Sequence, residues 1–391
     1  MTDQCFSSLL VTGGCGFIPS HFTNYILEQV KSGSIGTVIN YDRLTLASNK
    51  ANVISSNLTS QQYVLVTGDI CNRKLLDQTL HKYNVDAVVH FAALTHVCDS
   101  YKEPLEFVRS NVEGTVTLLE SCRAYGNIKR LVYVSTDEVY GDSVNDSEAK
   151  TELDSLKPTN PYSASKSSAE HFVNIYCKSY NFPAIVVRMC NVYGSHQSFD
   201  KVVPKFIKLA DQDKPFTISG DGRQMRCWLH VSDACSAIHT VLRRGRIGHV
   251  YNIGSSNEIS VLDLAKEIKK AVGTFKGKPQ TKMEIVHIPD RPYNDQRYHM
   301  DASKLKVELG WKESASFEEG LKDTVSWYLQ NQAAKTDRER IMIYGASGWI
   351  GGQFVNLLEK EGVEYVIGEK GLEMTQMKSS NEKYSLLLQH M

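Results

Sequence analysis

Short apolar runs alternate with longer amphipathic stretches through the first half of the chain, and this alternation restricts the folds it can adopt. Six runs have the length and composition of buried strands: residues 9–11, 37–39, 64–66, 87–89, 131–134 and 184–187. Helical periodicity covers residues 20–31, 72–83 and 105–125, and another helix is expected to begin near Tyr162. Strands that alternate with helices are typical of a parallel sheet covered on both faces. The sequence therefore predicts an α/β fold with a doubly wound parallel sheet.

Beyond residue 190 the alternation gives way to turns, short strands and separate helical segments at 261–271 and 317–330. We expect residues 1–190 to form the domain built on the sheet. Residues 191–330 are expected to form a smaller α/β lobe that closes over the strand ends and mainly binds the substrate.

The last part of the chain repeats the pattern seen at its beginning. Residues 331–340 are polar and charged, which is typical of a linker. A strand, a glycine-rich turn and the start of a helix then recur from Ile341 to Gly351. Only about 50 residues follow Ile341, fewer than the roughly 100 or more typical of a domain. We expect residues 341–391 to be a partial second unit of the same kind.

Composition excludes several classes of function. Lys and Arg number 44, as do Asp and Glu, so the formal charge is zero and no basic excess attracts nucleic acid or a membrane surface. No apolar run approaches the ~20 residues that span a bilayer, and the start of the chain lacks the features of a signal peptide. Nine cysteines are scattered without metal-ligand spacing. We expect a cytoplasmic protein with reduced thiols and no metal site.

A glycine-rich turn after the first strand indicates a dinucleotide site. Glycine lets the backbone approach a pyrophosphate, which binds the unpaired N–H groups at the helix N-terminus. A carboxylate at the end of the second strand can bind ribose hydroxyls and repels a 2′-phosphate, so NAD is favoured over NADP, although Arg43 is adjacent. Pro19 replaces the third glycine of the pattern, where a first helical turn tolerates it. The cofactor residues predicted here are Gly13, Gly16, Phe17, Ile18 and Asp42.

Five side chains indicate chemistry at the strand ends. Tyr162 and Lys166 are four residues apart and share a helix face, where a nearby ammonium is expected to lower the tyrosine pKa. Thr136, at the end of the strand, can orient a substrate alcohol. Asp137 and Glu138 follow it directly, in the crevice where open α/β sheets bind ligands. Adjacent buried carboxyls can have pKa values that are pushed apart, which leaves one of them protonated.

These motifs together resemble the extended short-chain dehydrogenase/reductase family, and within it the nucleotide-sugar 4,6-dehydratases that act on dTDP-glucose or UDP-glucose. The resemblance covers roughly residues 7–330. It is carried by the segments 68–70, 90–97, 111–115, 135–141, 162–166, 188–194, 220–226 and 291–298. It implies a Rossmann-type fold and a homodimer, built by helices near 101–125 and 162–180.

The resemblance also assigns binding residues. It implies that Asp69 and Ile70 border the adenine and that Ala92, Ala93 and Thr95 line the cofactor cleft beside Tyr162 and Lys166. It implies that the sugar nucleotide is held by His96, Asn191, Lys205, Arg226 and Arg291, with the two arginines facing the diphosphate. Guanidinium groups suit that position because they bind phosphate bidentately.

The mechanism implied by the resemblance has three steps. Tyr162, assisted by Thr136 and Lys166, takes the C4 hydroxyl proton while C4 gives hydride to NAD+. Glu138 then removes the acidified C5 proton as Asp137 protonates the departing C6 hydroxyl. Hydride returns to C6 and gives a 4-keto-6-deoxy sugar, so NAD is regenerated.

Departures from the family pattern bear on the nucleotide. Ser195 stands where proline is usual, and Cys227 stands where an acid or amide is usual. The segment from Ile341 resembles the start of the 3,5-epimerase/4-reductase domain found fused to UDP-glucose 4,6-dehydratases in rhamnose synthesis. It modestly favours UDP-glucose, but the sequence leaves dTDP and UDP open.

Two other functions fit parts of the sequence. A nucleotide-sugar 4-epimerase or decarboxylase of the same fold also uses Thr, Tyr and Lys, but an epimerase has no need of the acid pair at Asp137 and Glu138. A non-catalytic protein that binds NAD or sugar nucleotides has no need of the complete catalytic set.

Overall fold

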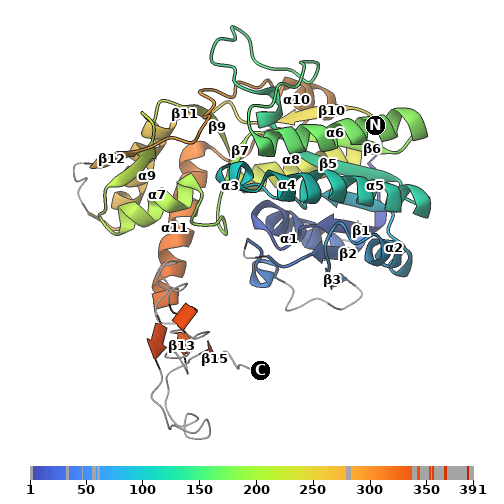
Figure 1. Cartoon of the computed structure of the whole chain (residues 1–391), viewed down its shortest axis with the longest axis horizontal. Coiled ribbons are helices and arrows are strands. Elements are labelled where there is room, and N and C mark those ends of the chain that lie inside the picture. The colour runs from blue at the N-terminus through green and yellow to red at the C-terminus, as the bar shows by residue number, and fades with distance from the viewer. Residues whose placement is uncertain are drawn as a thin grey trace, which may run out of the picture. The chain divides into compact units, whose positions relative to one another are not determined.

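A seven-stranded parallel sheet forms the centre of the structure, a computed structural model (Figure 1). Its strand order is β10-β6-β5-β4-β1-β2-β3, and all neighbours are parallel. The strands are β1 (Phe6–Thr12), β2 (Ile35–Asp42), β3 (Tyr63–Thr67), β4 (Ala87–His90), β5 (Arg130–Thr136), β6 (Ala184–Met189) and β10 (Val250–Ile253). Every predicted strand lies within one of them, so this part of the prediction is confirmed. Between β1 and β4 the strand order reverses, which is where such sheets bind dinucleotides.

Helices cover both faces of the sheet. Against it pack α1 (Phe17–Lys31) and α8 (Val231–Arg244) on one face and α2 (Arg73–Lys82), α5 (Gly114–Tyr125) and α6 (Pro161–Tyr180) on the other. The remaining helices are α3 (Val97–Lys102), α4 (Pro104–Phe107), α7 (Val202–Asp211), α9 (Val261–Phe275), α10 (Ser303–Leu309) and α11 (Phe317–Thr336), of which α7 and α9 pack on each other. Single turns are η1 (Lys50–Asn52) and η3 (Asp137–Tyr140), and η2 (Val108–Glu113) is a π-helical segment that joins α4 to α5.

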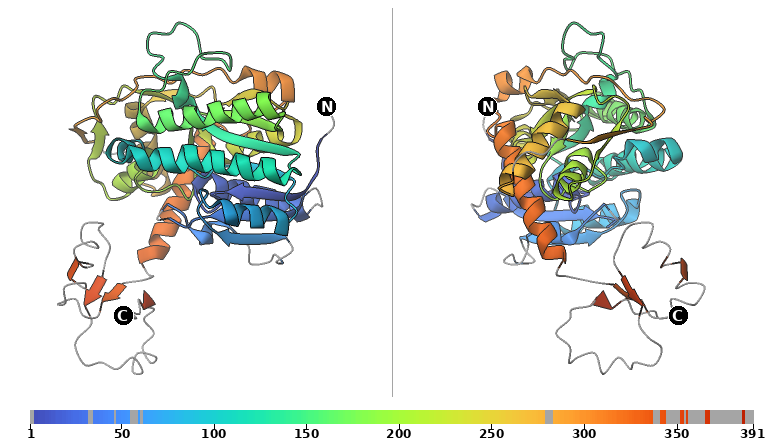
Figure 2. Two further views of the ribbon diagram at one scale, coloured as in Figure 1. Left: turned by 45° about the vertical axis from the view of Figure 1, so that its right-hand side comes forward. Right: turned by 90° about the vertical axis from the view of Figure 1, so that its left-hand side faces the viewer.

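Alternate strand residues enter two separate cores, as the period of a strand requires. Leu9 and Val132 pack with α1 and α8 on one face. Leu10 and Leu131 pack with α2, α5 and α6 on the other. Figures 1 and 2 show α5 and α6 side by side along this second face. The doubly wound α/β fold is therefore confirmed.

The region after β6 contributes small sheets beside the main one. β7 (Asn191–Tyr193), β9 (Met225–His230) and β11 (Glu258–Ser260) form one, and β8 (Phe216–Ser219) with β12 (Ile285–Ile288) forms another. The strand β10 departs from the predicted division at residue 190, because it returns to the main sheet and pairs with β6. The assignment of 191–330 to substrate binding stays a prediction.

The structure describes residues 3–31, 35–45, 47–54, 59, 62–278 and 283–336, and the short segments 341–343, 352–353, 355, 365–367 and 385–386. They belong to two compact units, residues 1–325 and 326–391. Helix α11 continues through Thr336, so the predicted linker at 331–340 begins as helix, and residues 337–340 lie outside the described part.

The described residues of the second unit include three short parallel strands. They are β13 (Ile341–Ile343), β14 (Tyr365–Ile367) and β15 (Ser385–Leu386), in the order β14-β13-β15. The predicted glycine-rich turn that follows β13 lies outside the described residues. The assignment of residues 341–391 as a partial second Rossmann-like unit stays a prediction. Across the described residues of the whole chain, no helix is both long and apolar enough to cross a bilayer.

Candidate active site

The acid pair lies where β5 ends and the chain turns sharply. β5 finishes at Thr136, whose hydroxyl accepts a hydrogen bond from the Glu138 N–H at 3.3 Å and so begins η3. Helix α6 begins after Asn160, whose side chain accepts from the Ser163 N–H at 2.8 Å. This N-cap places Tyr162 in the first turn of α6 and Lys166 one turn later.

A cavity of about 720 Å³ opens at the carboxyl ends of the strands. It brings together most of the predicted cofactor and catalytic residues, though not Asp137 and Glu138, which do not line it: Gly13, Gly16, Phe17, Ile18, Asp42, Ile70, Ala92, Ala93, Thr95, Thr136, Tyr162 and Lys166. Asp69 adjoins the lining residue Gly68, and its carboxylate lies 3.7 Å from the Arg43 guanidinium. Arg43 is thus directed toward Asp69.

The glycine turn packs against the neighbouring backbone too closely to accept a side chain at Gly13. Gly13 has φ +70°, and a Cβ there would lie 3.0 Å from the Cα of Ala92. The Asp42 carboxylate accepts from the Cys15 N–H at 2.9 Å, which ties the turn to the end of β2. It also accepts from the Leu44 N–H and the Ser48 hydroxyl. Because a carboxylate offers about four acceptor positions, one is left to face the cavity.

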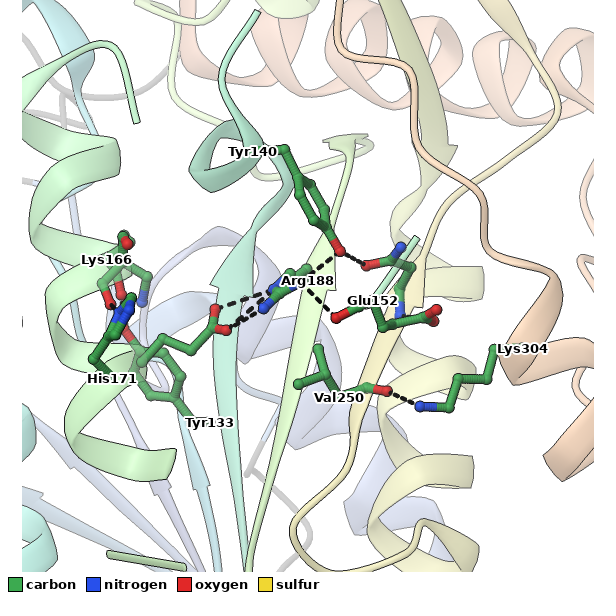
Figure 3. Close-up of polar contacts among 11 residues, drawn as sticks. Tyr133, Tyr140, Glu152, Lys166, His171, Arg188, Val250 and Lys304 are labelled. Carbon is green, nitrogen blue, oxygen red and sulfur yellow. Dashed lines mark hydrogen bonds and ion pairs between the residues drawn. The ribbon is translucent and has the colours of Figure 1, made fainter. Parts of the chain in front are cut away.

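The predicted effect of Lys166 on Tyr162 is wrong for this structure. The ammonium donates to the Val134 carbonyl at 2.7 Å and lies 4.4 Å from the centre of the Tyr133 ring, beside which Figure 3 shows it. Burial lowers the pKa of Lys166 to about 7, against the opposing charge of Glu170. The pKa of Tyr162 is raised, first by burial and then by the charge of Glu138. The carboxyls, rather than the ammonium, therefore dominate the field at the phenol.

The surroundings of Asp137 favour its protonated form, whereas positive charges near Glu138 support its ionised form. Burial, and then the charge of Glu138, raise the pKa of Asp137 to about 8. Burial also raises the pKa of Glu138, but the charges of Arg291 and Arg226 and a hydrogen bond from Asn160 act in the opposite direction. Asp137 is therefore protonated at neutral pH, and Glu138 is the member of the pair whose ionised form has cationic support.

The predicted substrate residues fall into two groups. His96 lines the cavity, with one ring nitrogen 2.7 Å from Asp99 and the other 3.5 Å from Asp200. The other four do not line it: Asn191, Lys205, Arg226 and Arg291.

The two arginines lie together near the acid pair. Arg226 and Arg291 both donate to the side-chain oxygen of Asn294. Arg226 also lies 4.4 Å from the centre of the Tyr298 ring. Their charges act on Glu138, so the structure brings them close to the acid pair.

Further side chains that hold Glu138 were not predicted from the sequence. The Asn160 amide donates to it at 3.2 Å, and the Tyr298 hydroxyl oxygen lies 3.4 Å from it. The single proton of that hydroxyl is donated at 2.5 Å to Asp295, which is fully buried. An Asn directly before Pro161 is a readable N-cap signal, so Asn160 could have been found. The contact of Tyr298 with residues so distant in sequence could not.

The strand order and the Thr, Tyr and Lys side chains at the strand ends define a Rossmann-type extended short-chain dehydrogenase/reductase. The family model described as GDP-mannose 4,6-dehydratase matches residues 10–324. The chain belongs to this family, which confirms the predicted membership.

Known proteins agree with this assignment. A trifunctional UDP-glucose 4,6-dehydratase/UDP-4-keto-6-deoxy-D-glucose 3,5-epimerase/UDP-4-keto-L-rhamnose-reductase of Arabidopsis thaliana is 37% identical over 94% of the chain, and the chain spans 61% of its length. The dTDP-D-glucose 4,6-dehydratase of Dictyostelium discoideum is 39% identical over 84% of the chain and 83% of its own length. The crystal structure of dTDP-glucose 4,6-dehydratase from Bacillus anthracis in complex with NAD has a TM-score of 0.75, 40% identity, and coverage of 84% of this chain and 98% of its own.

Proposed function

We propose that this protein is an NAD-dependent nucleotide-diphosphate-glucose 4,6-dehydratase, a hydro-lyase that makes the 4-keto-6-deoxy sugar. The observation that carries the proposal is the buried pair Asp137 and Glu138 beside Tyr162, with the pKa of Asp137 raised to about 8. An acid that is protonated near neutral pH and a neighbouring base are what removal of water requires. The dehydratase relatives and the NAD-bound structure support both the activity and the cofactor predicted from the sequence.

The residues around the cavity fit NAD. Gly13 lines the cavity without a side chain, so a pyrophosphate can come close to its backbone, and helix α1 begins four residues later. Asp42 offers a carboxylate at the end of β2 for ribose hydroxyls. When bound, NAD+ accepts a hydride from C4 of the sugar and gives it back at C6. The individual cofactor residues remain predictions.

The chain's own side chains would move the protons. Tyr162 takes the proton of the C4 hydroxyl as the 4-ketone forms, and Thr136 orients that hydroxyl. Since the pKa of Tyr162 is raised, a positive charge must come close before the phenol can ionise, and Lys166, one turn later on α6, is a cation that lines the same cavity.

The acid pair would carry out the elimination. Glu138 removes the C5 proton, and Asp137 protonates the C6 hydroxyl, which leaves as water. Glu138 then returns its proton to C5 when hydride reaches C6. The proton gained by Tyr162 and the proton lost by Asp137 exchange with solvent when the product leaves.

The sugar nucleotide is assigned to His96, Asn191, Lys205, Arg226 and Arg291. Buried polar atoms support this placement, because the Asn191 Oδ1, Arg291 Nε and Asp137 Oδ2 atoms have no hydrogen-bond partner among the described residues. Such atoms are costly unless a ligand satisfies them. Relatives that act on UDP-glucose and on dTDP-glucose both match, so either nucleotide is a candidate. The similarity to the Arabidopsis protein supports a role in rhamnose synthesis.

Proton NMR with UDP-glucose and, separately, dTDP-glucose at catalytic NAD+ tests the function. A new C6 methyl doublet with loss of the C5 proton signal is the expected result, and relative rates identify the nucleotide. A galactose-configured product would instead show a 4-epimerase. Tight NAD binding without turnover on either sugar would favour the non-catalytic alternative.

The protein is also proposed to form a homodimer. Apolar side chains are exposed along α4, η2 and α6, which pack against one another: Leu105, Val108, Phe172 and Ile175. Contiguous exposed apolar surface is typical of an interface. Leu105→Glu with Ile175→Glu is expected to give a monomer in sedimentation experiments. Val307→Glu is the control, because Val307 is 83% exposed on α10 and stands apart from this surface. A monomeric wild type, or dimers in all variants, contradicts the proposal.

A further inference from the structure

Two side chains to which no role has been given each lie about one helical turn after a proposed catalytic pair. The pairs are the acids Asp137 and Glu138, and Tyr162 with Lys166. Tyr140 comes three residues after Asp137 on η3. Glu170 comes four residues after Lys166 on α6. Both contact the same guanidinium, that of Arg188 on β6. Arg188, Glu170 and Tyr140 are called the Arg188 cluster below.

All three nitrogens of the Arg188 guanidinium donate hydrogen bonds within the cluster. The Nε of Arg188 donates to both carboxylate oxygens of Glu170, at 3.1 and 3.2 Å, and Nη2 donates to one of them. Nη1 donates to the Tyr140 hydroxyl at 2.6 Å. Arg188 also lies 4.7 Å from the centre of the Tyr140 ring. Figure 3 shows Arg188 reaching Tyr140 on one side, with the side chains of α6 on the other.

Tyr140 has no freedom to turn away from Arg188. Its hydroxyl donates its single proton to the Asn252 side-chain oxygen at 2.7 Å, so it can only accept from Arg188. Arg188, Glu170 and Tyr140 are all at least 96% buried. A charge that loses one partner at such depth is strongly disfavoured, so the cluster holds as a unit.

The acids themselves are held by long hydrogen bonds. Thr136 contacts Asp137 and the Glu138 N–H at 3.3 Å, the Asn160 amide donates to Glu138 at 3.2 Å, and the Tyr298 hydroxyl oxygen lies 3.4 Å from Glu138. A single 3₁₀ turn has little stability of its own. The shortest side-chain bonds of η3 are those of the Tyr140 hydroxyl, at 2.6 and 2.7 Å. On the backbone, the Val139 carbonyl accepts from the Lys157 N–H at 2.9 Å. Among the side chains of the turn, Tyr140 is therefore the one that fixes its position.

We propose that Arg188 is a positioning residue that fixes the turn carrying Asp137 and Glu138 relative to the helix carrying Tyr162 and Lys166. It acts through Tyr140 on one side and Glu170 on the other, and does not touch the substrate. The elimination needs both pairs at one sugar, whereas C4 oxidation needs only the α6 pair and Thr136. Loss of the contact to Tyr140 therefore slows elimination selectively. The proposal rests on the dehydratase function.

Tyr140→Phe tests the proposal, because it removes the hydrogen bonds of the hydroxyl to Arg188 and Asn252 and keeps the ring that Arg188 packs against. Tyr251→Phe is the matched control: Tyr251 is fully buried on β10, and its hydroxyl is hydrogen-bonded to Arg246 and Glu308, away from the cavity. In rapid-mixing experiments with the sugar nucleotide, NADH formation and product formation are followed separately. Tyr140→Phe is expected to form product roughly tenfold to hundredfold more slowly, a loss typical of small misplacement. Its NADH forms at the wild-type rate and accumulates.

Two further measurements separate positioning from general destabilisation. Amide hydrogen exchange of residues 138–141 without substrate is expected to speed up in Tyr140→Phe and to stay unchanged in Tyr251→Phe. Arg188→Lys keeps the charge but lacks the planar fork, so it is expected to behave like Tyr140→Phe.

The outcomes distinguish this proposal from the proposed function. Oxidation and product formation that slow in proportion, or exchange that does not change at 138–141, overturn the positioning role alone. A wild-type protein that dehydrates neither sugar nucleotide overturns the function, and the positioning role with it.

Discussion

Asp137 makes the stability of the protein depend on pH. Its pKa is about 8 in the folded chain and 3.8 in a solvated aspartate, so the folded chain binds more protons between these values. Stability therefore falls as pH rises from about 4 to about 8. Asp137→Asn removes this titration and is expected to be less sensitive to pH.

Denaturant unfolding of both proteins between about pH 5 and about pH 8 measures this difference. The variant should gain stability relative to the wild type as pH rises. Parallel curves for the two proteins would mean that Asp137 ionises normally and is not the acid of the elimination.

Alanine substitutions at Gly13 and Gly126 distinguish the cost of backbone strain from the cost of a steric contact. Both have positive φ, +70° and +78°, so an alanine at either costs about 1–2 kcal/mol. A Cβ at Gly126 meets nothing within 4 Å, whereas one at Gly13 meets the backbone of Ala92 at the cavity. Gly126→Ala should lose stability and keep its NAD affinity. Gly13→Ala should lose more stability and bind NAD more weakly in calorimetric titration; equal NAD affinities would contradict the cofactor site.

Single residues show where sequence reasoning stopped. The spacing of Tyr162 and Lys166 correctly predicted a shared helix face, but not that Lys166 would donate to the Val134 carbonyl. Arg188 stands in an apolar strand, which signals a buried charge, but its partners come from α6 and η3. Contacts between elements distant in sequence carry no periodic signal, so only the structure could provide them.

At the scale of elements, the start of α6 is linked to the acid pair through Asn160. Its side chain caps the helix and also donates to Glu138. Asn160→Asp keeps an acceptor for the cap but places a carboxylate beside Glu138, which raises the pKa of Glu138. At acidic pH, where the two carboxyls share a proton, the variant should be nearly as stable as the wild type, while elimination requires higher pH.

Asn160→Ala is the comparison, since it loses the cap as well and should cost about 1 kcal/mol of stability. Thermal unfolding and the pH profile of product formation, measured on both variants, check this. An unshifted profile in Asn160→Asp would remove Glu138 from the role of base.

Regular elements were predictable where one period dominates. The six predicted strands are short apolar runs, and each lies in the sheet. The stretch 105–125 is helical throughout, but its π-helical segment, Val108–Glu113, leaves no mark on the apolar pattern. β10 was missed because four residues at the edge of a sheet resemble any short strand of a loosely patterned region.

At the scale of the whole molecule, the site belongs to the first unit. The cavity is lined by residues between Gly13 and Lys201, and the side chains around the acid pair extend to Tyr298. All fall within residues 1–325. A chain that ends at Thr336, with α11 intact, is therefore expected to keep the dehydratase rate and the unfolding temperature of the full chain. A lower rate at equal stability would give the second unit a part in turnover.

The place of β10 in the sheet has a consequence for synthesis. β6 pairs with β5 on one side and with β10 on the other, and Asn252 on β10 accepts the Tyr140 hydroxyl proton. Until residues 250–253 have emerged from the ribosome, the edge of β6 that β10 later covers is open to pairing with other chains. A nascent chain of that length already carries Thr136, the acid pair, Tyr162 and Lys166, but it lacks the strand that completes their support.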